Sequence, residues 1–273
     1  MAVHLGIHAD RLTGVRALRS GKGRREQRRF AFEGTTLLEE ARRSGFPIDE
    51  LYCTAAAYDA SALVRELDAT GIPVFIVDEG RAAQLSDLKT PSGVLAIAPL
   101  RLDPIETLLA RGDLVLVLAD VNDPANAGSL LRSADAFGCA GVVFGRLGVD
   151  PYHPKVVRSS MGAAFRLPVA VADPPEVAVA AARANFRLVG LAADAACLST
   201  GQFERPLAVV VGNERHGLGR WEALCERVVA IPMVGPAESL SAAVAGSIAL
   251  YEASRSLPCQ ESTPEAKSQD YRH

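Results

Sequence analysis

LVLVLADVNDPANAGSLLRSA, residues 114–134, sets the architecture of the second half of this chain. Its first six residues form an unbroken apolar run, which is typical of a strand buried on both faces of a parallel sheet. A helical pattern follows, and strand and helix patterns keep alternating, which predicts an α/β domain. The expected strands are 114–119, 141–144, 168–171, 187–191, 207–211 and 228–231, and the expected helices are 127–137, 175–184 and 239–254.

Polar residues follow the buried strand directly. Asn122, Asp123 and Pro124 favour a turn, and Asp123 or Asn126 can cap the next helix. Open α/β sheets bind ligands beyond the carboxyl ends of their strands, so this turn is well placed for a site. Arg132, in the second turn of the helix, can point back toward the strand ends. Taken by itself, the stretch is explained more readily as a turn, a cap and a surface arginine.

Two later segments also join a strand to a loop. In VGNERHGL, residues 211–218, Gly212 permits close approach of the backbone to a ligand, and Glu214 is either a ligand contact, a structural contact or a solvated side chain. In IPMVGPAESLSAAVA, residues 231–245, Ser239 is a natural N-cap for a helix rich in small residues. A capped, tightly packed core helix explains this last segment equally well.

Two common nucleotide-binding motifs are missing from the sequence. No GxGxxG follows any strand, which argues against a dinucleotide-binding oxidoreductase, and no GxxxxGK[ST] is present, which argues against a P-loop. The five cysteines are scattered, form no CxxC pair and lie at no ligand-like spacing from a histidine, so no metal site is expected. Scattered thiols and the lack of a signal peptide or a long apolar run predict a cytoplasmic protein.

The first half, residues 1–99, combines a basic stretch with an α/β pattern. Its expected helices are 36–43 and 61–70, and its expected strands are 51–54, 73–77 and 93–98. Pro104 and Gly112 predict a linker over residues 100–112, so that the second domain spans 113–256. Residues 257–273 are rich in polar residues and are expected to be a disordered tail.

Charge points to nucleic acid only locally. The net charge of the 273 residues is −3, but between Arg16 and Arg29 lie seven cationic residues opposed by Glu26 alone. Such a cluster attracts phosphates because its binding releases condensed counterions. A solvated basic face is the simpler explanation of the composition.

Order and spacing of the segments resemble the motifs of the SPOUT superfamily, TrmH (SpoU) family of RNA ribose 2′-O-methyltransferases. The first motif, N-x-G-x-x-x-R, is matched by Asn126, Gly128 and Arg132. The second is matched by Gly212, Asn213, Glu214, Gly217 and Leu218, and the third by Ile231, Pro232, Met233, Ser239 and Leu240. Ser241 stands where the family usually has Asn, and residues 155–163, KVVRSSMGA, form a further family-like stretch.

The resemblance implies a C-terminal SPOUT-type α/β domain with a trefoil knot that binds S-adenosylmethionine. The positions implied for cofactor binding are Leu191, Gly212, Asn213, Ile231, Met233 and Leu240. The family assigns proton removal from the 2′-hydroxyl to the Arg132 position. Because the pKa of arginine is above 12, we expect Arg132 instead to stabilise the developing alkoxide or to hold the adjacent phosphate. Asn126, Glu214 and Ser239 would orient Arg132 and the ribose.

The first half is similar to the smaller, L30-like α/β substrate-binding domain of the family. The similarity rests on residues 29–34, 37–41 and 90–96. It favours RNA binding by the basic stretch, with Arg24, Arg25, Arg28, Arg29 and Arg158 as candidate RNA contacts. The similarity also favours 23S ribosomal RNA over transfer RNA as the substrate, and the family resemblance as a whole implies a homodimer. A non-catalytic RNA-binding protein with the same fold is the alternative, and a housekeeping or an antibiotic-resistance role is left open.

Overall fold

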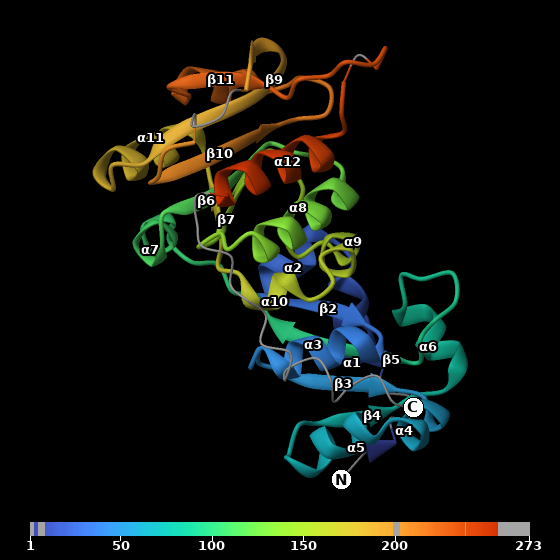
Figure 1. The fold of residues 1–273 in the computed structure, drawn as a ribbon. Helices are drawn as coiled ribbons and strands as arrows, with labels where there is room; N and C mark the ends of the chain where they lie inside the picture. The colour runs from blue at the N-terminus through green and yellow to red at the C-terminus, as the bar shows by residue number, and fades with distance from the viewer. Residues whose placement is uncertain (1–2, 5–8, 199–202, 238, 256–273) are drawn as a thin grey trace, which may run out of the picture.

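The computed structural model describes residues 3–4, 9–198, 203–237 and 239–255. They form two α/β units placed end to end, the N-terminal one coloured blue to cyan and the C-terminal one green to red (Figure 1). The α/β class predicted from the sequence is confirmed for both units. Within the described residues, no helix is long and apolar enough to cross a membrane.

The N-terminal unit is built on a mixed five-stranded sheet of order β1-β4-β3-β5-β2. Strands β1, β4 and β3 are parallel, whereas β5 runs antiparallel to both β3 and β2. In chain order the elements are β1 Val3–His4, α1 Ala9–Ala17, α2 Gly21–Gln27, β2 Arg29–Glu33, α3 Thr35–Arg43, β3 Glu50–Cys53, α4 Ala55–Ala60, α5 Ala62–Ala69, β4 Val74–Ile76, α6 Glu79–Leu85 and β5 Val94–Pro99.

The C-terminal unit is built on a six-stranded sheet of order β11-β9-β10-β6-β7-β8, and all five strand pairings are parallel. Its elements are α7 Ile105–Arg111, β6 Leu114–Ala119, α8 Pro124–Ala136, β7 Val142–Gly145, α9 Pro154–Ser159, α10 Ala163–Arg166, β8 Val169–Ala172, α11 Pro174–Arg183, β9 Arg187–Cys197, β10 Leu207–Gly212, the 3-10 helix η1 Gly219–Leu224, β11 Arg227–Ala230 and α12 Ala242–Ser254. The six predicted strands are all present. The trefoil knot stays a prediction of the family resemblance.

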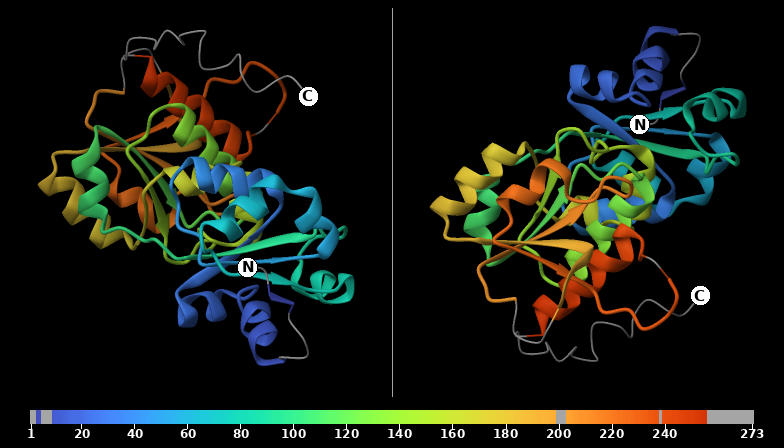
Figure 2. Two further views of the ribbon diagram at one scale, coloured as in Figure 1. Left: turned by 90° about the horizontal axis from the view of Figure 1, so that it is seen from below. Right: turned by 90° about the horizontal axis from the view of Figure 1, so that it is seen from above.

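The position of strand β6 in the sheet explains why its sequence is apolar without interruption. It lies between β10 and β7, and all six of its residues are buried. Leu116 packs into the cluster formed with α8 and α12, whereas its neighbour Val117 packs into the opposite cluster with α7, α11 and Trp221. Because successive side chains of a strand point to opposite faces, a sheet covered by helices on both faces needs apolar residues at every position (Figure 2).

Residues 100–112, expected to be a linker, contain helix α7. Ile105, Leu108 and Leu109 are buried against the six-stranded sheet, so this stretch belongs to the packed structure rather than to an extended connection. Pro104 and Gly112 flank the helix at its two ends, so the residues that suggested a linker instead mark where α7 begins and ends. The domain boundaries drawn from the sequence stay a prediction, and the expected tail lies outside the described residues.

The two units share one apolar interface. Phe30 and Phe32 of β2 pack on Tyr152 and Phe165 of the C-terminal unit, with ring centroids 4.5 Å apart for Phe30 and Tyr152 and 4.9 Å apart for Phe32 and Phe165. Buried aromatic pairs contribute about 0.5–1.5 kcal/mol each beyond their burial. The N-terminal unit is therefore held against the C-terminal unit by core packing.

Candidate active site

A pocket opens at the carboxyl ends of strands β10 and β11, beside the middle of β9 and the start of α12. This edge of a parallel sheet is where ligands bind in open α/β folds. The pocket brings together segments that are up to about fifty residues apart in the chain. It is lined by Leu191, Ala192, Ala193, Val211, Gly212, Asn213, Glu214, Gly217, Val229, Ile231, Met233, Ser239, Leu240, Ala242 and Ala245.

All six residues predicted to bind the cofactor line this pocket, together with Glu214 and Ser239. Leu191, Ile231 and Leu240 supply apolar surface of the kind that accepts a purine ring. The loop after β10 adds backbone polar groups and one carboxylate. The residues present therefore suit a nucleoside-containing donor. The sequence motifs did not identify Ala192, Ala193 and the small side chains of α12, because alanine carries no chemical signal.

Gly212 is needed for the shape of the loop after β10. A Cβ at this position would overlap the carbonyl group of Gly217 and the amide of Leu218. Asn213 and Gly217 exchange two backbone hydrogen bonds across the turn, of 2.8 and 3.0 Å. Gly217 itself has a φ of 58°, in the left-handed region that favours glycine. The two glycines of the motif thus permit a tight turn at the pocket wall.

Glu214 joins the second motif to the first. Its carboxylate accepts hydrogen bonds from the backbone amides of Asn122 and Asp123, both at 3.2 Å, and from the Asn126 side-chain amide at 2.9 Å. Partial burial opposes ionisation of Glu214, but the hydrogen bonds from Asn126 and from the backbone outweigh it and lower its pKa. The pairing of Asn126 with Glu214 explains why both motifs need these residue types.

Arg132 lies outside the pocket wall, on the exposed surface of α8. It makes no hydrogen bond or ion pair within the described part of the chain, so its guanidinium is free to meet a ligand. The adjacent Ser133 hydrogen-bonds Ser247 of α12 at 2.7 Å, which ties the two helices together. Gly128 allows α8 to approach α9, because a Cβ there would overlap Ser159 and the Val156 carbonyl.

The start of α12 corrects one prediction. The helix begins at Ala242, and its N-cap is Ser241, whose hydroxyl accepts from the Val244 amide at 3.3 Å. Ser239 lines the pocket but does not cap the helix. Serine and asparagine are equally good N-caps, so the departure from the family pattern at Ser241 preserves this structural role.

The predicted RNA contacts divide into two groups. Arg24 is a correction, because it is only 2% exposed and its guanidinium pairs with Asp150 of the other unit at 2.7 Å. Arg29 pairs with Asp49 and Glu50, and Arg158 pairs with Asp87, so phosphates would have to compete with these carboxylates. Arg25 and Arg28 are exposed and have no ion pair among the described residues.

The family-like stretch 155–163 lies at the interface between the two units. Val157 packs into the shared aromatic core, and Arg158 reaches Asp87 of the N-terminal unit at 3.1 Å. Gly162, with a φ of 90°, lies against Glu40, where a Cβ would overlap the glutamate side chain. This stretch therefore holds the N-terminal unit against the C-terminal unit.

No group of three or more histidine, cysteine or acidic side chains is arranged to hold a metal ion in the ranges that the structure describes. The expectation that the reaction needs no metal stays a prediction.

Comparisons with known proteins agree with this architecture. Residues 113–251 match the SpoU rRNA Methylase family, and residues 10–96 match the MRM3-like substrate binding domain. The 23S rRNA (uridine(2479)-2′-O)-methyltransferase of Streptomyces viridochromogenes is 40% identical over 176 residues, a match that spans 61% of each protein. The 23S rRNA (guanosine(2553)-2′-O)-methyltransferase RlmP of Bacillus subtilis is 30% identical over 86% of this chain and 92% of its own length.

Among solved structures, the SpoU methyltransferase AviRb from Streptomyces viridochromogenes in complex with AdoMet superposes with a TM-score of 0.81 at 32% identity. That match covers 90% of this chain and 97% of AviRb. The fold, the motif-bearing pocket and the family match over the whole methylase domain lead to one conclusion: the chain belongs to the SpoU rRNA methylase family.

Proposed function

We propose that this chain transfers the methyl group of S-adenosylmethionine to a ribose 2′-hydroxyl of ribosomal RNA, and specifically of 23S rRNA. The observation that carries the proposal is the convergence of the motif loops at one site. Glu214 in the pocket wall is bonded to Asn126, and Asn126 shares helix α8 with Arg132, which has no ion pair among the described residues. The donor pocket and the guanidinium that would meet the acceptor are thus connected through the Glu214–Asn126 hydrogen bond and helix α8.

The residues divide between holding the donor and activating the acceptor. When bound, S-adenosylmethionine supplies an electrophilic methyl group on a sulfonium. A C–O bond to the 2′-oxygen forms, the C–S bond breaks, and the hydroxyl proton leaves to water. Arg132 stabilises the negative charge that develops on the 2′-oxygen or holds the adjacent phosphate, since its guanidinium cannot act as a base near neutral pH. Holding donor and acceptor in contact contributes several kcal/mol of barrier reduction.

The choice of 23S rRNA rests on relatives and on the N-terminal unit. The curated relatives from Streptomyces viridochromogenes and Bacillus subtilis are both 23S rRNA 2′-O-methyltransferases. Of the predicted RNA contacts, Arg25 and Arg28 are exposed and have no ion pair among the described residues, which makes them the best placed for phosphates.

We also propose that the protein acts as a homodimer through helix α12. Val244, Ile248 and Tyr251 recur every three to four residues and are 46%, 37% and 54% exposed, so they form an apolar stripe on the outer side of the helix. A continuous apolar stripe on a surface helix favours association. Sedimentation of the wild type and of Ile248→Glu tests this: a dimer that becomes a monomer supports it, and a monomeric wild type excludes it.

The central experiment uses unmodified 23S rRNA and methyl-labelled S-adenosylmethionine, followed by alkaline hydrolysis. A methylated 2′-oxygen cannot attack the neighbouring phosphate, so label in alkali-resistant dinucleotides identifies ribose methylation. Label in single nucleotides would indicate base methylation instead. Transfer RNA, offered in parallel, tests the alternative substrate. RNA binding without any incorporation would favour the non-catalytic RNA-binding protein, against which the retained Arg132, Glu214 and Ser239 argue.

A further inference from the structure

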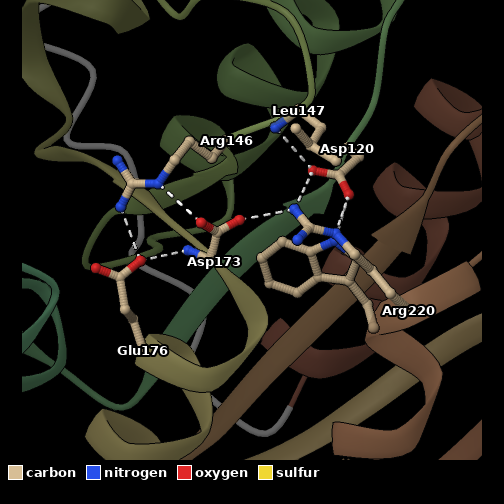
Figure 3. Close-up of polar contacts among 7 residues, drawn as sticks. Asp120, Arg146, Leu147, Asp173, Glu176 and Arg220 are labelled. Atoms are coloured by element: carbon tan, nitrogen blue, oxygen red, sulfur yellow. Dashed lines mark hydrogen bonds and ion pairs between the residues drawn. The ribbon is translucent and has the colours of Figure 1, made fainter.

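Asp120 directly follows strand β6 and has an unusual backbone conformation. Its φ of 56° lies in the left-handed region, which non-glycine residues seldom occupy. Its carboxylate accepts hydrogen bonds from the Trp221 indole N–H at 2.8 Å and from Arg220 Nε at 2.9 Å, and from the Leu147 amide at 3.2 Å (Figure 3). Strained backbone of this kind persists only where the surroundings hold it, and it clusters at functional sites.

The space around the carboxylate is tightly built. Trp221 is 1% exposed, so its indole N–H needs a partner, and Asp120 provides it. A Cβ on Gly145 would overlap the Asp120 carboxylate, so the next strand of the sheet leaves room for this group. Partial burial opposes ionisation, but the hydrogen bonds from Arg220 and Trp221 outweigh it and lower the pKa of Asp120.

The ion pairs continue away from the site. Arg220 also binds Asp173 at 2.7 Å, and Arg146 binds both Asp173 at 2.9 Å and Glu176 at 2.8 Å (Figure 3). These outer pairs are exposed, and exposed pairs contribute little to stability. The inner contacts, between Asp120 and Trp221 and between Asp120 and Arg220, therefore set the orientation of the carboxylate.

The backbone of Asp120 connects this cluster to the candidate active site. Its carbonyl accepts a hydrogen bond of 2.8 Å from the side-chain amide of Asn213, which lines the pocket. The backbone amides of Asn122 and Asp123, two and three residues after Asp120, donate hydrogen bonds to the Glu214 carboxylate. The turn at Asp120 thus contacts the second motif through Asn213 and aims the amides of the first motif at Glu214.

We propose that Asp120 is a positioning residue for methyl transfer: its carboxylate, held by Trp221 and Arg220, fixes the left-handed turn that aligns the Asn122–Asn126 segment with Glu214 and thereby orients α8 and Arg132. The inference rests on the proposed function. A group that only stabilises the fold would change the melting temperature, whereas a positioning group changes kcat while cofactor affinity is kept.

The test compares Asp120→Asn with Trp221→Phe. Asparagine tolerates the left-handed region well and is nearly isosteric, so Asp120→Asn removes the charge but keeps the turn accessible. Trp221→Phe removes the indole donor and leaves the carboxylate. Arg146→Met is the matched control, since it cuts the outer ion pairs without touching Asp120. All are assayed well below their melting temperatures for kcat, for KM and for the dissociation constant of S-adenosylmethionine.

We expect kcat to fall roughly 10- to 30-fold in Asp120→Asn and by several-fold in Trp221→Phe, with the cofactor dissociation constant within about threefold of wild type. The double variant should lose less than the product of the single losses, because both remove one interaction. Arg146→Met should keep kcat within about twofold. The inference would be overturned if Asp120→Asn kept the wild-type kcat. It would also be overturned if the loss of activity were no larger than the fraction of the variant that is unfolded. A wild type without any ribose methylation would instead overturn the proposed function.

Discussion

The carboxyl edge of the catalytic sheet is used differently in its two halves. Beside β9 and beyond β10 and β11 the chain forms a pocket with apolar and small side chains. Beyond β6, β7 and β8 the same edge is closed by the ion pairs of Asp120, Arg146, Asp173, Glu176 and Arg220 (Figure 3). One parallel sheet therefore supplies an open half that receives a ligand and a closed half that supports the loops around it.

The difference follows from what each half must do. A ligand that buries apolar surface needs a mostly apolar wall with few polar groups, and close approach needs glycine and alanine. A supporting structure gains from paired charges, because each pair restrains two side chains and the loops that carry them. Glu214 and Asn213 lie where the halves meet, and both bond to the loop after β6. Substitutions in the open half should lower the affinity for the cofactor, and substitutions of the ion pairs in the closed half should lower stability. Substitution of Arg132 should change neither quantity.

The largest effect is expected for Arg132→Ala. Removal of a group that stabilises transition-state charge lowers kcat by roughly 10²- to 10³-fold. Since Arg132 does not line the pocket, the dissociation constant of S-adenosylmethionine should stay within about twofold, measured by calorimetry. Arg183→Ala, an exposed arginine on α11, is the control and should keep full activity. An active Arg132→Ala enzyme would remove this residue from the mechanism.

Gly212→Ala is expected to distort the pocket in the open half and to leave the ion pairs of the closed half intact. The new Cβ would overlap the Gly217 carbonyl, so the turn must widen, and cofactor affinity should fall at least about tenfold. Gly14→Ala in α1 is the matched control, because a Cβ there meets nothing closer than 3.9 Å and alanine favours helix. Unchanged cofactor binding by Gly212→Ala would mean that this turn does not shape the donor site.

The ion pairs of the closed half predict that its contribution to the free energy of unfolding depends on pH. Hydrogen bonds from Arg220 lower the pKa of Asp173, and in Asp120 the bonds from Arg220 and Trp221 outweigh the opposing effect of burial. Carboxylates with a lowered folded-state pKa stabilise the fold above their ordinary pKa near 4, and this contribution is lost as the pH falls through the folded-state value. The difference in free energy of unfolding between wild type and Arg220→Met should therefore shrink between pH 6 and pH 3. Urea titrations measure it, and a constant difference would contradict the ion-pair description.

The smallest effect is expected for Ser241→Asn, which restores the usual family residue. Both residues cap helices well, so the melting temperature should change by less than about 2 °C. Ser241→Ala, by contrast, should cost about 1 kcal/mol, because the Val244 amide loses its acceptor. A clear rise in kcat for Ser241→Asn would show that the family asparagine also has a role toward the substrate.

The sequence was most informative where one physical requirement dominated. The apolar run Leu114–Ala119 could be assigned because a strand covered on both faces has no polar position, and its bounds agree with the structure. The motif residues Gly212, Ile231 and Leu240 were brought to one pocket as the family resemblance implied. Several short elements of the N-terminal unit, such as α2, α4 and α6, were missed. They are only six or seven residues long, and caps and tertiary contacts, rather than periodicity, define them.

The basic stretch shows the opposite case. Arg24 and Arg25 are adjacent and chemically identical in sequence, yet Arg24 is buried against Asp150 and Arg25 is exposed. Residue type sets the charge of a side chain, but its partners come from segments far away, here 126 residues along the chain. The sequence does not single out Asp120 for the same reason, because its partners Trp221 and Arg220 lie about 100 residues downstream.

By itself, then, the amino-acid order determined the α/β class, the parallel sheet and the motif set that marks the family, since these depend on local periodicity and on residues of fixed spacing. Only the tertiary structure decided which arginines are free, which serine caps α12 and which carboxylate supports the loop after β6. Those outcomes depend on burial and on long-range pairing, which arise when the two units and the strand ends come together.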